Sequence, residues 1–454
     1  MMSTGGTGQA EADRGEAGGV RTALAGLTTR GRSFLAAGIA AAICAYVLGQ
    51  SDLLRVGLLL AVLPLLCATV LYRTRYRVAG GRRLSPARVP ATGEARVHLR
   101  VDNVSRLPTG LLMLQDRVPY VLGPRPRFVL DRVEPGGHRE VSYRVRSDLR
   151  GRYPLGPLQL RLSDPFGMCE LTRSFSAYDT LTVIPRVRPL APVRFSGEAQ
   201  GYGDGRQRAT ALAGEDDVIP RGYRYGDDLR RVHWRSTARY GELMVRREEQ
   251  PRRSRCTVLL DTRAVGYEGA GPDSAFEWAV SGAASVLVHM LERGFSVRLL
   301  TDGGSSVPAE GADGFAGGQE TADAAGLMMD TLAVIDHSDG TGLSRAYDML
   351  RGGNEGLLIA FLGDLDEEQA ATVARMSRRS GGAVAFVLDP DTWAREASDV
   401  PGPGAGRHAE RLRVLREAGW TALGVPRGAS LDDLWRQADR ERSGLASVSG
   451  EARG

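Results

Sequence analysis

The strongest hydrophobic pattern in the chain is a pair of uncharged apolar runs near its N-terminus, at residues 34–49 and 56–72. A membrane-spanning helix needs about 20 mostly apolar residues, and each run reaches that length once its flanks are counted. The connector between them, at 50–55, is very short. Residues 33–72 are therefore predicted to form two transmembrane helices, after a disordered N-terminal segment at 1–32.

Arginines flank this pair of runs on both sides. The connector, by contrast, holds only Arg55, which Asp52 offsets in charge. By the positive-inside rule, both ends of the pair face the cytoplasm. We therefore expect a two-pass protein of the inner (cytoplasmic) membrane, in contact with the lipid bilayer, with both termini and the soluble domains in the cytoplasm. A cleaved signal peptide would explain the first run alone, but a second run follows it directly. The flanking arginines are Arg14, Arg21, Arg30, Arg32, Arg73, Arg75, Arg77, Arg82 and Arg83.

Apolar and polar residues alternate with a period of two between residues 88 and 186. Val97, Leu99 and Val101 alternate with charged or polar neighbours, and the same pattern recurs at 141–145 and 158–162. Such alternation is typical of half-buried strands. Turn-forming segments such as 134–137 separate the strands, so a β-sandwich-like middle domain is predicted, serving as a spacer or interaction module. A linker is expected at 187–217.

From residue 256 onward, short continuous apolar strands alternate with segments of helical period. Strands are predicted at 256–260, 296–300, 357–362, 383–388 and 421–425, and helices at 275–293, 367–379 and 409–418. Strands of this kind indicate a sheet covered on both faces, hence a doubly wound, mainly parallel α/β domain with its ligand crevice at the carboxyl ends of the strands. This domain and the segment before it span 218–440, followed by a disordered tail at 441–454.

The most densely charged segment, at 221–246, mixes arginines, acids and aromatic residues. One interpretation is a phosphate or acidic-partner site; the other is an ion-pair network that docks this segment on the following domain. The residues of this charged signature are Arg224, Tyr225, Asp227, Asp228, Arg230, Arg231, His233, Trp234, Arg235 and Arg239.

Aspartates end three of the predicted strands, at Asp261, Asp302 and Asp364. Converging carboxylates suit a divalent ion such as Mg²⁺, but short polar residues also end strands and cap the helices that follow. The glycine-rich loop at 303–318 lacks the phosphate-binding patterns. No metal site, cofactor or catalytic set is therefore predicted, and the aspartates are a degenerate metal candidate.

Composition removes other classes of function. The 59 basic residues are all arginine and alternate with 54 acidic ones, so the net charge of +5 does not indicate nucleic-acid binding. The four cysteines form no CxxC pair, which argues against a disulfide framework or a zinc site.

The chain resembles the bacterial membrane-anchored family called domain of unknown function fifty-eight in a set of motifs that follow one another in the same order. The motifs are the turn at 164–167, then 224–228 with Arg230, the triplet 233–235, and 238–243, before the Asp261–Thr262 strand end. The resemblance implies a von Willebrand factor type A-like C-terminal domain. It also implies a MoxR-type AAA+ ATPase and a transglutaminase-like membrane protein as partners.

Type A domains that bind metal use an Asp-x-Ser-x-Ser loop, whereas residues 261–265 here read Asp-Thr-Arg-Ala-Val. Both serines are missing, and Arg263 brings a positive charge beside the expected ion position. The sequence therefore favours a non-enzymatic membrane scaffold or adaptor that works with the ATPase. The alternatives are a metal-dependent hydrolase or ligand-binding domain that uses the strand-end aspartates, or an envelope protein whose middle domain recognises a peptide.

Overall fold

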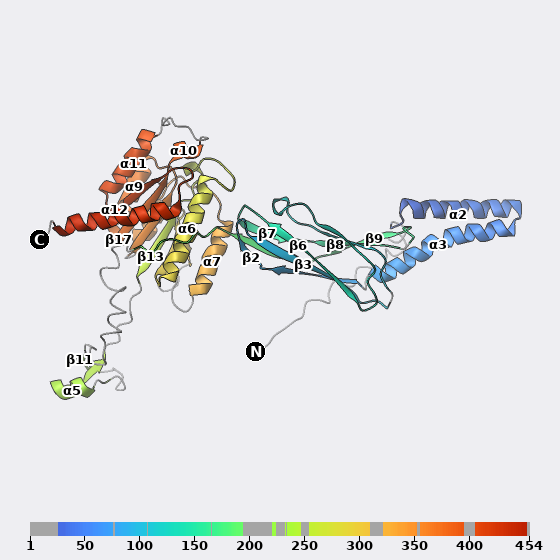
Figure 1. The fold of residues 1–454 in the computed structure, drawn as a ribbon, viewed down its shortest axis with the longest axis horizontal. Helices are drawn as coiled ribbons and strands as arrows, with labels where there is room; N and C mark the ends of the chain where they lie inside the picture. The colour runs from blue at the N-terminus through green and yellow to red at the C-terminus, as the bar shows by residue number, and fades with distance from the viewer. Residues whose placement is uncertain are drawn as a thin grey trace. The chain divides into compact units, whose positions relative to one another are not determined.

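The chain divides into two compact units, Met1–Ile184 and Pro185–Gly454, each described by itself (Figure 1). The computed structural model describes residues 26–75, 78–106, 108–164, 166–193, 220–223, 232, 234–246, 254–308, 321–351, 355–394 and 405–451.

The first unit begins with an antiparallel helical hairpin, α2 (Thr29–Leu48) and α3 (Ser51–Arg75). Both helices are long and apolar enough to cross a membrane, which confirms the predicted pair of candidate spans. α2 begins four residues before the predicted start. The helices approach closely because Gly38 and Gly57 have no side chain: a Cβ at Gly57 would lie 2.7 Å from the backbone nitrogen of Ala42. Such small residues permit close packing of helices in lipid.

The rest of this unit is a β domain whose sheets enclose one apolar core. Its first strand starts at Val78, ten residues before the predicted boundary at 88. One sheet has the order β1-β3-β6, a second β5-β4-β8-β9 and a third β2-β10-β7. The strands are β1 (Val78–Ser85), β2 (Arg88–Pro90), β3 (Glu94–Asn103), β4 (Leu112–Asp116), β5 (Arg127–Leu130), β6 (His138–Arg146), β7 (Gly151–Leu155), β8 (Leu158–Ser163), β9 (Glu170–Phe175) and β10 (Asp179–Ile184).

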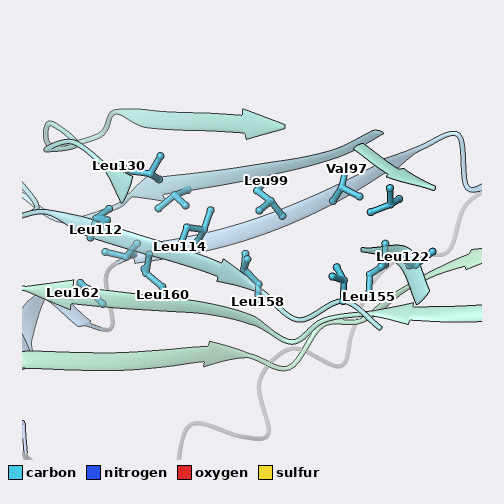
Figure 2. Packing of buried hydrophobic residues seen from close by; sticks show 14 of the residues in the cluster. Val97, Leu99, Leu112, Leu114, Leu122, Leu130, Leu155, Leu158, Leu160 and Leu162 are labelled. Carbon is cyan, nitrogen blue, oxygen red and sulfur yellow. The ribbon is translucent and has the colours of Figure 1, made fainter. Parts of the chain in front are cut away.

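The period-two pattern predicted the buried face of these strands. Val97 and Leu99 of β3 point into the core together with Leu158, Leu160 and Leu162 of β8 (Figure 2). The side chains of the two sheets meet between the layers, as expected of two sheets packed face to face.

The second unit contains a six-stranded sheet of order β15-β14-β13-β16-β17-β18, in which only β15 is antiparallel. The strands are β13 (Arg255–Leu260), β14 (Ser296–Thr301), β15 (Ser306–Val307), β16 (Glu355–Leu362), β17 (Ser380–Leu388) and β18 (Thr421–Val425). The helices are α6 (Ala275–Glu292), α7 (Thr321–Val334), α8 (Ser344–Arg351), α9 (Glu367–Met376), α10 (Pro390–Ala394), α11 (Ala405–Glu417) and α12 (Leu431–Glu451).

All five predicted strands and all three predicted helices of this unit are present, with ends that differ by a few residues. Helices α7, α8, α10 and α12 were not predicted. α12 continues to Glu451, so the prediction of a disordered tail at 441–454 is wrong for most of that segment. Trp435 of α12 and Trp278 of α6 each donate a hydrogen bond from their indole nitrogen, and these bonds join the helix to neighbouring segments.

The predicted linker at 187–217 is held to this unit at its start. The backbone nitrogen of Arg188 donates to the Ser285 hydroxyl on α6, and that of Ala191 donates to Asp432 on α12. Trp435 donates to the carbonyl of Ala191 at 3.0 Å. These residues are part of the α/β unit, and the linker from 194 onward lies outside the described residues.

Candidate functional site

The strand order of the α/β unit marks one position at its carboxyl edge. The chain proceeds from β13 outward through β14 to β15, then crosses to β16 on the other side of β13. In open α/β sheets, ligands bind outside the carboxyl ends of the strands at such a switch point. Here the residues that follow β13, β14 and β16 meet the loop at 337–341. We call Asp261, Thr262, Arg263, Asp302, Ser338 and Gln369 the carboxyl-edge cluster.

The centre of this cluster is a buried ion pair between Arg263 and Asp261. Neither side chain is more than 1% exposed. The Arg263 Nε donates to Asp261 Oδ1 at 2.9 Å, and Nη2 donates to Oδ2 at 2.8 Å, a two-point contact typical of arginine and carboxylate. The backbone nitrogens of Arg263 and Gly363 also donate to Asp261. All four bonds fix the carboxylate of Asp261 in place.

The remaining guanidinium hydrogens of Arg263 are directed at oxygens of the opposite wall. They are donated to the Gln369 side chain and to the carbonyls of Asp364 and Thr341. Burial by itself lowers the pKa of Arg263, but the hydrogen bonds and charge of Asp261 outweigh it and raise the pKa. The guanidinium therefore stays charged and joins the ends of β13 and β16 to α9.

Asp302, at the end of β14, accepts hydrogen bonds from two neighbouring segments. Its Oδ1 accepts from the Thr262 nitrogen at 2.9 Å and from the Thr262 hydroxyl, and its Oδ2 accepts from Ser338 at 2.8 Å. Loop 337–341 is also held by the backbone bond from Ala264 to Ser338. The two strand-end carboxylates thus lie close together, as the sequence predicted. Both accept hydrogen bonds from other residues of the same chain.

Three rings lie over this position. The hydroxyl of Tyr267 donates to the Asp261 carbonyl at 2.7 Å, and its ring lies 5.2 Å from that of Phe276 and 5.7 Å from that of His337. Burial and the charge of Asp261 raise the pKa of Tyr267 well above its ordinary value, so the phenol is neutral.

The other strand-end aspartate stands apart from the cluster. Asp364 is exposed, and its Oδ1 accepts the backbone nitrogen of Leu365. Asp366 caps α9 by accepting from Gln369 at 2.8 Å, the local role that short polar residues have at helix starts. Within the described ranges, no group of three or more His, Cys, Asp or Glu side chains has the arrangement to hold a metal ion.

Part of the charged signature lies on a described hairpin and helix. A short hairpin of β11 (Pro220–Gly222) and β12 (Met244–Arg246) carries the two-turn helix α5 (Trp234–Tyr240). Trp234, Arg235 and Arg239 lie on this helix and are exposed. The residues outside the described part of the chain are Arg224, Tyr225, Asp227, Asp228, Arg230, Arg231 and His233.

One buried charge cluster in the β domain was missed from the sequence. Arg82, counted among the arginines that flank the membrane, is 2% exposed and lies inside the domain. It binds Asp116 at two points, and Tyr143 donates to the same carboxylate at 2.6 Å. The available signal was the inward-facing position of Arg82 in a strand. It was overlooked because β1 was not recognised as a strand.

The fold and cluster thus define an open α/β domain with a buried arginine at its switch point, on a chain that carries two candidate membrane spans. The family described as "Protein of unknown function DUF58" matches residues 220–384, which include α5 and all six residues of the carboxyl-edge cluster. The uncharacterized protein YeaD of Bacillus subtilis (strain 168) is 29% identical over 168 residues. The alignment covers 36% of this chain and 39% of YeaD, so it spans about two fifths of that relative.

Likeness to solved structures is low. The CARDB domain of the PF1109 protein from Pyrococcus furiosus is 10% identical, with a TM-score of 0.18 and coverage of 24% of this chain and 87% of that one. The sporulation control protein Spo0M of Bacillus subtilis is 12% identical, with a TM-score of 0.16 and coverage of 24% and 49%. With TM-scores at this level, neither structure bears on function.

Proposed function

We propose that this protein is a membrane-anchored, non-enzymatic scaffold or adaptor whose α/β domain binds other proteins on the cytoplasmic side of the inner membrane. The observation that carries the proposal is the Asp261–Arg263 ion pair. A metal-dependent enzyme needs carboxylate oxygens that are free to bind the ion. Here a guanidinium lies on Asp261, while Asp302 holds Thr262 and Ser338. Such an arrangement favours a rigid binding surface over chemistry.

A von Willebrand factor type A-like fold for the α/β domain is part of this proposal. Two features support it: the parallel sheet with one antiparallel edge strand, and Asp261 at the end of the central strand β13. Arg263 stands where metal-binding type A domains have the first serine of their loop. The guanidinium of Arg263 thus takes the place that the metal ion has in such a site.

The surface around the cluster is acidic. Asp336, Asp339, Asp364 and Asp366 are all exposed on the loops that follow α7 and β16. Four carboxylates at one edge favour a partner surface rich in arginine and lysine, because complementary charge steers association and excludes wrong partners. The proposed partner is a MoxR-type AAA+ ATPase, with a transglutaminase-like membrane protein as a second member of the same assembly.

The test is a binding measurement with the full-length protein in lipid nanodiscs and a MoxR-type AAA+ ATPase from the same genome. Affinity is measured with ATP, with ADP and without nucleotide. We expect binding in at least one nucleotide state. Failure to bind in all three would remove the ATPase from the proposal.

Charge-reversal variants then locate the surface. Asp336→Arg with Asp339→Arg changes the acidic edge, and Arg235→Glu with Arg239→Glu changes α5. We expect the variant at the true interface to weaken binding about tenfold or more, since it places like charges opposite each other. Unchanged affinity in both variants would place the partner elsewhere.

A matched control variant carries the same kind of change away from both surfaces. Arg378→Glu with Arg440→Glu reverses two exposed arginines, one just before β17 and one on α12, and should bind like the wild type. Each variant must also unfold at the wild-type temperature, because loss of binding counts only in a folded protein.

A further inference from the structure

The junction between α3 and the β domain is packed rather than flexible. Ala68 and Leu71, in the last turns of α3, are buried in the same apolar cluster as Val78 of β1 and Leu171 of β9. Only two residues separate the end of α3 from β1. The end of the helix is therefore part of the core of the β domain.

The start of α2 is fixed to the same end of the domain. The backbone nitrogen of Thr28 donates to the carbonyl of Met168 at 2.9 Å, and its hydroxyl donates to the carbonyl of Gly167 at 2.7 Å. Gly31, one turn into α2, lies so close to the Met168 carbonyl that no side chain fits between them. Both helices thus leave the β domain from one place, at fixed positions.

The length of the hairpin locates that end relative to a bilayer. Val70 is 46% exposed and lies about 20 residues from the start of α3 at Ser51. At 1.5 Å per residue this distance is about 30 Å, the thickness of the hydrocarbon core. On α2, the outward-facing apolar residues extend back to Phe34. A bilayer that covers the apolar surface of the hairpin therefore reaches the β domain itself.

Two loops of the β domain lie at this end. The first loop, described at 104–106 and 108–111, follows β3, whose last residue Asn103 pairs with Val78, the first residue of β1. The loop at 164–169 receives the Thr28 hydrogen bonds and joins the first loop through the bond from Ser163 to Leu111. Each loop presents large apolar side chains to the outside: Val104 is 69% exposed, Leu111 51% and Phe166 60%.

Exposed arginines accompany these apolar residues. Arg30 and Arg32 lie in the first turn of α2, and Arg106 lies two residues from Val104. Apolar side chains beside arginines match the surface of a leaflet, where acyl chains lie below anionic phosphates.

We propose that Val104, Leu111 and Phe166 form a lipid-binding surface that inserts into the headgroup region of an anionic membrane. The inference rests on the proposed membrane anchoring of α2 and α3. It adds that the β domain lies directly on the bilayer, held by its own side chains as well as by the spans. The occupant is phospholipid, because the hairpin brings the bilayer to these residues.

The experiment measures depth in the membrane at three positions of the full-length protein. It is reconstituted in vesicles of phosphatidylcholine and phosphatidylglycerol that contain nitroxide-labelled lipids. One environment-sensitive fluorophore is attached to Cys44, which is exposed on α2, in the otherwise unchanged chain. In a Cys44→Ala background it is attached instead to Phe166→Cys or to Tyr120→Cys, and Cys44→Ala alone gives the background from the buried cysteines.

Tyr120 is the matched control for Phe166, because it is also an exposed aromatic residue, 91% exposed, on a loop of the same domain. It follows β4, which starts at Leu112 beside the membrane loops and runs away from them to Asp116. We expect strong quenching of the label at 166 by headgroup nitroxides, strong quenching at 44 by acyl-chain nitroxides, and no quenching at 120.

Two results would overturn the inference in distinguishable ways. Quenching at 44 with none at 166 would leave the anchor in place and show that the loops do not contact lipid. If the label at 166 were then also shielded from an aqueous quencher, a protein would cover the loop instead. No quenching at 44 would remove the membrane anchor and, with it, the lipid-binding surface.

Discussion

Replacement of Arg263 by methionine tests whether the carboxyl-edge cluster holds the α/β domain together. Methionine keeps an unbranched apolar stem but removes the guanidinium and its charge, so Asp261 stays buried without its cation. Breaking a buried ion pair at one partner costs about 3–5 kcal/mol, because the remaining charge is uncompensated. A typical domain has a free energy of unfolding of about 5–15 kcal/mol, so the loss is a large share.

The size of the thermal effect follows from the size of the domain. For domains of about 150–250 residues, 1 kcal/mol changes the melting temperature by roughly 2–4 °C, so Arg263→Met should lower it by roughly 6–20 °C. Tryptophan fluorescence reports this change for the α/β unit alone, since all five tryptophans of the chain lie after residue 185. Arg407→Met, on the exposed face of α11, is the matched control and should melt like the wild type.

A second variant separates the charge from the packing. Asp261→Asn combined with Arg263→Met removes both charges, and we expect it to be more stable than Arg263→Met alone. Double-mutant comparison of the two single variants with the pair gives their coupling energy. A loss below about 1 kcal/mol in Arg263→Met, or a double variant less stable than that single one, would refute the structural role of this ion pair.

Two further predictions concern the helical hairpin and the histidine on α6. Gly57→Leu should separate α2 from α3, because the backbone of Ala42 must move back by about 0.7 Å to restore an ordinary contact of 3.4 Å. The distance between spin labels on the two helices measures this separation. Leu58→Ala, on the outer face of α3, should leave that distance unchanged. Burial, with the charge of Arg293, lowers the pKa of His289 in the folded state. The folded protein therefore has its full stability above the unfolded-state pKa of about 6.5, and it loses stability as the pH falls through that value. His289→Leu should therefore flatten the fall in melting temperature between pH 7 and 5.5, and an unaltered slope would contradict the assignment.

The period of the hydrophobic pattern was sufficient for the helical hairpin, for strands β3, β6 and β8 of the β domain, and for five strands of the α/β sheet. Val97 and Leu99 alternate with charged neighbours and are fully buried, since a half-exposed sheet leaves its polar positions in water. Helix α12 was missed: its first half was assigned to the α/β domain without a predicted element, and its second half was predicted as a disordered tail. Trp435 is nevertheless fully buried against α6, and that burial depends on a partner distant in sequence.

The sequence by itself determined that the chain has two apolar helices, a β domain and an α/β domain, and that Asp261 and Asp302 end parallel strands. It also placed Arg263 beside Asp261, because the two residues are neighbours in the chain. Only the tertiary structure decided what these groups do. The direction of the Arg263 side chain, the closure by Gln369 from α9 and the burial of Arg82 against Asp116 all depend on segments far apart in sequence. Local patterns report which residues avoid water, whereas the pairing of buried charges is set by which strands and loops the fold brings together.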